Sequence, residues 1–153
     1  MSHSIAVLLS AFVLCLSGCG RTIISEPINR VGNGWTLEIR KVTDGPNSID
    51  EGDIILEAKD GERLIWVALT LRNDEPQPRT FNFDRCDLDM GTQAVVPSTV
   101  THDMLMGYAS EMNRAPELEP EESIDRRLVF VYPQGQSPTR LRCEPMEFPL
   151  PQF

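Results

Sequence analysis

The stretch LIWVALTL, residues 64–71, decides the fold class of this chain of 153 residues. In an extended strand, successive side chains point to opposite faces. One face would carry Ile65, Val67, Leu69 and Leu71. The other would carry Trp66, Ala68 and Thr70. Since both faces are largely apolar, the segment is expected in the centre of a sheet, covered on both sides.

Weaker strand segments are expected before and after this strand, most of them with the same two-residue alternation and one, residues 54–56, a short apolar run. They cover residues 35–40, 54–56, 79–84, 86–90, 94–100, 124–132 and 141–143. No segment has the period of an amphipathic helix, and residues 101–113 are expected to form a short helix or a long loop. The 12 prolines fall mostly between the expected strands. The pattern predicts one all-β domain, folded as an antiparallel β-sandwich.

The N-terminus has the composition of an export signal. Residues 5–16 contain one polar residue, Ser10, and are too few to span a membrane but suit the apolar core of a signal peptide. The sequence Leu-Ser-Gly-Cys, residues 16–19, follows and closely resembles the bacterial lipobox. This resemblance implies that the thiol of Cys19 is alkylated with diacylglycerol and that the chain is cut before it.

The lipobox resemblance implies a signal peptide at residues 1–18 and a lipidated tether at residues 19–34, with room for a brief strand at residues 22–25. Gly20, and not Asp, follows the cysteine. In a host with two membranes, this resembles the pattern of lipoproteins at the periplasmic face of the outer membrane. A cleaved signal without lipid and a buried N-terminal segment with an ordinary core cysteine are the alternatives.

Two cysteines remain for the folded domain, Cys86 and Cys143. An exported chain with two thiols in an oxidising compartment has one possible internal pairing. The sequence therefore predicts a disulfide between Cys86 and Cys143. Two free or intermolecular thiols are the alternative.

Two longer segments resemble a bacterial family of exported Ig-like domains of unknown function. GERLIWVALTLRNDEPQPRTFNF, residues 61–83, is similar to its apolar strand ending in Asn, its turn and its Phe-rich strand. LEPEESIDRRLVFVYP, residues 118–133, is similar to its Leu-x-Pro-Gly-Glu-Ser signature, with Glu121 in place of the usual Gly. The resemblance implies an Ig-like sandwich over residues 35–153 and supplies no catalytic residues.

Charge and motifs argue against several functions. The chain has 14 basic and 23 acidic residues, a net charge of −9, which repels nucleic acid. There is no Gly-x-Ser-x-Gly, and nothing places a serine beside His102, the one histidine after residue 18. Two cysteines alone do not make a zinc site. An acidic cluster is interpreted as a solvated turn: Glu117, Glu119, Glu121 and Glu122. The sequence predicts no catalysis, no metal and no cofactor.

The segment HDMLMGYASEM, residues 102–112, combines a histidine with soft thioethers. Methionines here would fill gaps at the edge of the sandwich or form a surface for a partner. The predicted binding residues are His102, Met104, Met106, Tyr108 and Met112. Imidazole and thioether ligands also suit Cu(I), so copper handling in the periplasm through His102, Met104, Met106 and Met112 is the alternative.

Together these patterns predict a lipoprotein attached to the bilayer of the cell envelope through acylated Cys19. Its Ig-like domain is expected to bind an envelope protein, or to serve as an accessory of envelope assembly, without catalysis.

Overall fold

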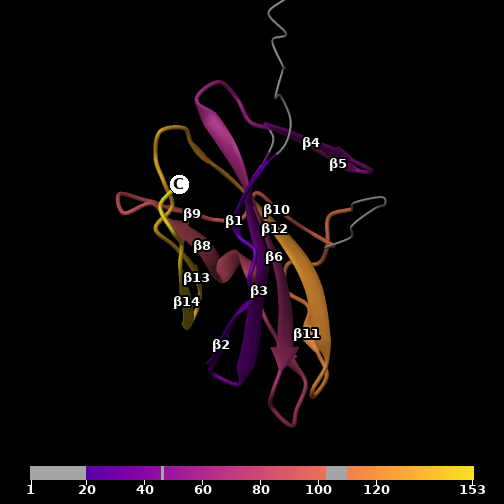
Figure 1. Ribbon diagram of the computed structural model, residues 1–153. Coiled ribbons are helices and arrows are strands. Elements are labelled where there is room, and N and C mark those ends of the chain that lie inside the picture. Colours follow the sequence, from indigo (N-terminus) through magenta and orange to yellow (C-terminus); the bar gives the residue numbers. More distant parts are fainter. Residues whose placement is uncertain (1–19, 46, 103–109) are drawn as a thin grey trace, which may run out of the picture.

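The computed structural model describes residues 20–45, 47–102 and 110–153 (Figure 1). Among these residues, no helix is long and apolar enough to cross a membrane.

The larger sheet of the sandwich has six antiparallel strands. They are β1 (Arg21–Ile24), β2 (Ile28–Gly32), β3 (Trp35–Asp44), β6 (Glu62–Asn73), β10 (Thr99–Thr101) and β12 (Ser123–Pro133). The order is β1-β3-β6-β12-β10, and β2 also pairs with β3. The predicted central strand, residues 64–71, lies in β6 and is flanked by β3 and β12.

The smaller sheet has four strands, in the order β14-β13-β8-β9. They are β8 (Cys86–Asp89), β9 (Ala94–Val95), β13 (Arg140–Cys143) and β14 (Met146–Pro149). Two separate ribbons pair β4 (Ser48–Glu51) with β5 (Ile54–Glu57), and β7 (Arg79–Thr80) with β11 (Glu117–Leu118). A single 3₁₀ turn among the described residues, η1 (Phe83–Arg85), precedes β8.

The core confirms the prediction of an all-β antiparallel sandwich. On β6, Ile65, Val67, Leu69 and Leu71 are fully buried and face the main apolar cluster between the sheets. On its opposite face, Leu64 and Trp66 belong to a second cluster, which includes Ile49 and Ile54 of the β4–β5 ribbon. This ribbon explains why both faces of the strand are apolar, because it covers part of the outer face.

The structure contains the predicted disulfide between Cys86 and Cys143. The two cysteines lie directly opposite each other on β8 and β13, with their Cα atoms 4.1 Å apart, and both are fully buried. The bridge therefore joins neighbouring strands of the smaller sheet.

The predicted tether at residues 19–34 differs from the structure. Residues 21–32 form β1 and β2, which pair along β3, so the domain begins about 14 residues earlier than expected. The β2–β3 hairpin turns at Asn33 and Gly34, whose φ angles are 54° and 75°. Asn-Gly is the preferred pair for such a turn, because both positions need a positive φ.

Asn73, the last residue of β6, joins two turns at one end of the sandwich. Its side chain is fully buried and donates to the carbonyl oxygens of Gln77 at 2.8 Å and Leu118 at 3.0 Å. Its side-chain oxygen accepts from the Glu75 amide at 3.1 Å. One amide group thus satisfies backbone groups from the β6–β7 turn and the β11–β12 segment.

We expect Asn73→Ala to lower the free energy of unfolding by about 2–4 kcal/mol, because it leaves buried backbone groups without partners. Chemical denaturation of both proteins would measure this difference. The control Asn29→Ala changes an exposed residue of β2 and should cost less than about 0.5 kcal/mol. Equal effects of the two substitutions would contradict the role assigned to Asn73.

Glu121 adopts a conformation that suits glycine. Its φ angle is 63°, in the left-handed region. The backbone amide of Glu121 donates to the carbonyl oxygen of Asn73 at 2.8 Å, which holds this turn in place. A side chain at such a φ meets a steric cost of roughly 1–2 kcal/mol per residue.

We therefore expect Glu121→Gly to raise the free energy of unfolding by about 0.5–1 kcal/mol, since relief of strain exceeds the added freedom of the unfolded chain. Glu119→Gly, at another exposed position of this segment, serves as the matched control and should not stabilise the fold. Thermal unfolding of the three proteins in parallel tests this. A lower Tm for Glu121→Gly would show that the freedom gained by the unfolded chain outweighs the strain relieved at this φ.

Candidate functional site

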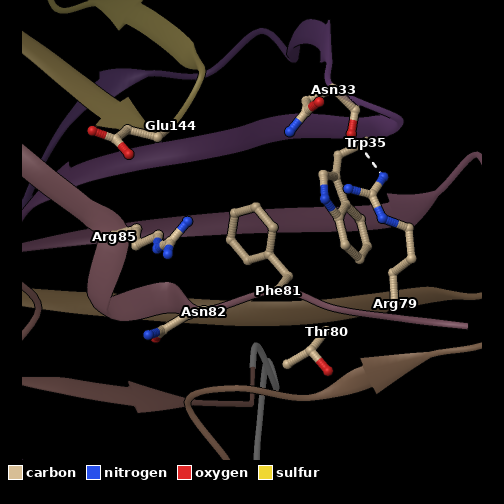
Figure 2. Close-up of a pocket in the computed structure, with 8 residues that line it drawn as sticks. All are labelled: Asn33, Trp35, Arg79, Thr80, Phe81, Asn82, Arg85 and Glu144. Atoms are coloured by element: carbon tan, nitrogen blue, oxygen red, sulfur yellow. Dashed lines mark hydrogen bonds between the residues drawn. The ribbon is translucent and has the colours of Figure 1, made fainter.

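A cleft of about 310 Å³ opens at the end of the sandwich where β3 begins. Figure 2 shows the side chains around it, which come from the β2–β3 hairpin, from β7 and the segment between β7 and β8, and from the turn after β13. The lining residues are Asn33, Trp35, Arg79, Thr80, Phe81, Asn82, Arg85 and Glu144.

Aromatic rings form the floor of the cleft. Trp35 and Phe81 meet edge to face with their ring centroids 5.3 Å apart, and Phe81 meets Phe83 in the same way at 5.1 Å. All three are buried, at 5% exposure or less. The alternation in residues 81–83 directs both phenylalanines into the core, while Asn82 between them is exposed. The rings therefore give the cleft a rigid base.

Arg79 closes one side of the cleft and is occupied by contacts within the protein. Its guanidinium lies over the ring of Trp35 at 5.0 Å, and its Nη1 donates to the carbonyl oxygen of Asn33 at 2.7 Å. A cation over an indole ring is attracted to the negative face of the ring. Arg79 therefore stabilises the rim and the β2–β3 turn.

Arg85 and Glu144 stand on the other side of the Phe81 ring (Figure 2). Both side chains are exposed, and within the described part of the chain neither forms an ion pair or a side-chain hydrogen bond. Arg85 ends η1, which Asn82 caps by accepting from the Asp84 amide at 2.9 Å. The cleft thus presents one free cation and one free anion to a ligand.

The predicted binding segment, residues 102–112, begins and ends at the β10 edge of the larger sheet. Thr101 forms an isolated bridge with Glu111, and the Met112 amide donates to the Val100 carbonyl oxygen at 2.8 Å. His102 is half-buried, and Met112 is half-buried against the main apolar cluster. The Met112 contact is the one expected if this methionine fills a gap at the sandwich edge.

The other three residues predicted for this segment, Met104, Met106 and Tyr108, lie outside the described residues. The copper alternative therefore stays a prediction. In the described ranges, no group of three or more His, Cys, Asp or Glu side chains could hold a metal ion. The acidic cluster around the β11–β12 turn is exposed at all four positions: Glu117, Glu119, Glu121 and Glu122.

Cys19, the predicted lipidation site, also lies outside the described residues. The next residue, Gly20, already contacts the end of β3, because a Cβ atom placed on it would lie 2.8 Å from the Asp44 carbonyl oxygen. The described chain therefore joins the sheet from Gly20 onward.

The side chain of Asp44, at the end of β3, is buried and bonded on two sides. Its carboxylate pairs with Arg63 and accepts from the Tyr132 hydroxyl at 3.0 Å. Burial and the adjacent Asp44 charge raise the pKa of Tyr132, so this hydroxyl stays a proton donor.

The sequence reasoning did not identify the cleft residues as a site. A local signal was present in RTFNFDR, residues 79–85, where two arginines flank alternating phenylalanines. Asn33 and Glu144 join this segment only through the pairing of distant strands, which no local pattern reports.

No protein-family model and no curated protein sequence matches the chain. Among solved structures, the fold is similar to that of a functionally unknown protein from Listeria monocytogenes, with a TM-score of 0.57, 13% sequence identity and 89% of each chain covered. An uncharacterised β-sandwich protein from Clostridium difficile 630 gives a TM-score of 0.45 at 13% identity, covering 82% of this chain and 85% of that one. The first similarity concerns the fold alone.

Proposed function

We propose that the protein is a lipid-anchored envelope module that binds a partner protein through the cleft of Figure 2, without catalysing a reaction. Cys19 carries the anchor in this proposal, and the sandwich carries the recognition site. Support comes from the lipobox resemblance at residues 16–19 and from the position of the cleft relative to the start of the domain.

One observation carries the proposal: Gly20, the residue after the proposed anchor, and the cleft lie at opposite ends of β3. Gly20 contacts Thr43 and Asp44 at the end of this strand, whereas Trp35 at its beginning supports the cleft. The ten residues of β3 span roughly 30 Å. A domain tied to the membrane at residue 19 would therefore present its cleft on the side remote from the bilayer.

The chemistry of the cleft favours a polar peptide segment as the ligand. Arg85 can donate two parallel hydrogen bonds to a carboxylate, and Glu144 can accept from an ammonium or amide group. Because both side chains are exposed, a ligand can reach them without disturbing the core. A protein segment with an acidic and a basic or amide side chain would satisfy both charges.

The anchor is tested by metabolic labelling with palmitate. We expect the wild-type protein to incorporate the label and Cys19→Ser to incorporate none, because the thiol is the acceptor. Cys15→Ser is the matched control: it lies in the predicted signal peptide, so the mature protein should still be labelled. An unlabelled wild type, or a labelled Cys19→Ser protein, would overturn the lipid anchor.

The cleft is tested by photocrosslinking in intact cells. A photoreactive residue at position 80, on the cleft rim, should capture one defined envelope protein, and one at position 57, on the exposed side of β5, should not. Arg85→Gln should weaken capture about 10- to 150-fold, since a hydrogen bond to a charged group contributes roughly 1.5–3 kcal/mol. Arg21→Gln, an exposed arginine at the other end of the sheet, is the control. Capture that survives both Arg85→Gln and Glu144→Gln would exclude the cleft as the binding site.

A further inference from the structure

A second pocket, with a volume of about 470 Å³, adjoins the cleft at the turn between β13 and β14. Glu144, which borders the cleft in Figure 2, lines both hollows. The residues that line the second pocket are Asp87, Arg142, Glu144, Pro145, Met146 and Glu147. A ligand that occupies the cleft can therefore extend past Glu144 into this pocket.

The strand register places three charged residues of the second pocket in one row. Arg142 on β13 lies directly opposite Asp87 on β8 and directly opposite Glu147 on β14. Their neighbours along each strand are buried, so the row lies on the outer face of the smaller sheet. The pocket is therefore open to solvent and has an acid–base–acid row along it.

Two of the three carboxylates that line this pocket already have a cationic partner. The Nε of Arg142 donates to Asp87 at 2.8 Å, and the Nη1 of Arg140 lies 3.1 Å from the Glu147 carboxylate. The third, Glu144, is exposed and forms no ion pair or side-chain hydrogen bond with residues 20–45, 47–102 or 110–153. The uncompensated charge at the junction of cleft and pocket is therefore negative on the side of the second pocket.

Carbon surface lies next to this free carboxylate. Pro145 is exposed and Met146 is 3% exposed, and both line the second pocket. The backbone of Gly32 packs closely against them, since a Cβ atom placed on it would lie 3.0 Å from Pro145 Cγ and 3.1 Å from Met146 Cγ. Apolar surface beside a carboxylate suits lysine or arginine, because the aliphatic stem packs on carbon while the charged end stays in polar surroundings.

The chain itself indicates the spacing between the cation of the cleft and the second pocket. Arg85 lines the cleft, and Asp87, two residues later, lines the second pocket. Cys86 between them is extended, with φ −85° and ψ 137°. Side chains two residues apart in an extended segment share one face and lie about 6.5 Å apart. An extended ligand matches this spacing when its acidic and basic side chains are also two positions apart.

We propose that the second pocket is a subsite for a lysine or arginine side chain of the partner protein. This inference rests on the proposed function and narrows its ligand to an extended segment that carries an acidic residue and, two positions away, a basic one. The acidic side chain of the ligand pairs with Arg85 in the cleft. Its basic side chain pairs with Glu144 from the second pocket, with its stem against Pro145 and Met146.

The test follows one resonance in each hollow, using the full-length chain purified in detergent micelles. The Met146 methyl resonance of ¹³C-methyl-methionine protein, assigned by its loss in Met146→Leu, reports on the second pocket. The Trp35 indole resonance of ¹⁵N-tryptophan protein, assigned by its retention in Trp66→Phe, reports on the cleft. The methyl group of Met90, which is buried and lines neither hollow, is the internal control and should not move.

The probes are capped five-residue peptides titrated at equal ionic strength. Ala-Glu-Ala-Lys-Ala and its reverse, Ala-Lys-Ala-Glu-Ala, have the proposed spacing in both chain directions. We expect one of the two to shift both resonances and to bind about 2- to 5-fold more tightly than Ala-Glu-Ala-Gln-Ala, the usual gain from an exposed ion pair. The Gln peptide should shift the Trp35 resonance alone. Ala-Glu-Lys-Ala-Ala has the same composition with adjacent charges and should show no such gain.

A pair of variants separates the subsite from general attraction of cations to this acidic chain. Glu144→Gln should abolish the gain from lysine, whereas Glu57→Gln, at an exposed position of β5, should keep it. A gain that survives Glu144→Gln, or that is equal for the peptide with adjacent charges, would overturn the subsite. Shifts of Trp35 without any shift of Met146 would also overturn the subsite and leave the proposed cleft standing. If neither resonance responds to any peptide, the cleft fails as a peptide site and the proposed function fails with it.

Discussion

The buried amide of Asn73 holds together the end of the sandwich that carries the cleft. The turns at this end have few apolar residues of their own, and several of their backbone groups form hydrogen bonds with this one side chain. The same end includes the β7–β11 ribbon, from which Arg79 and Thr80 reach the cleft. Loss of the amide would therefore loosen the floor and the rim together, although Asn73 itself does not line the cleft.

Sequence reasoning predicted the parts of the fold that bury side chains on a regular period. Residues 64–71 were recognised as central because both faces are apolar, and the cysteine count predicted the bridge from Cys86 to Cys143. The brief strand expected at residues 22–25 corresponds to β1, but its pairing with the domain and the strand β2 were missed because both strands lie along the edge of the sheet. Only Ile24 is buried there, so no clear alternation marks them, and the Asn33-Gly34 turn was the one signal of the hairpin.

The candidate sites were harder to predict for a different physical reason. The sequence directed attention to one contiguous segment, residues 102–112, whereas the cleft combines residues 33–35, 79–85 and 144, which meet only after distant strands pair.

The position of the disulfide makes the geometry of the cleft depend on whether Cys86 and Cys143 are oxidised. Arg85 directly precedes Cys86, and Glu144 directly follows Cys143, so the sulfur–sulfur bond fixes the backbone spacing from which both charges of the cleft extend. Reduction would leave β8 and β13 joined only by their ladder of hydrogen bonds. Display of the paired charges therefore depends on the disulfide, and its reduction would loosen the spacing that a ligand has to match.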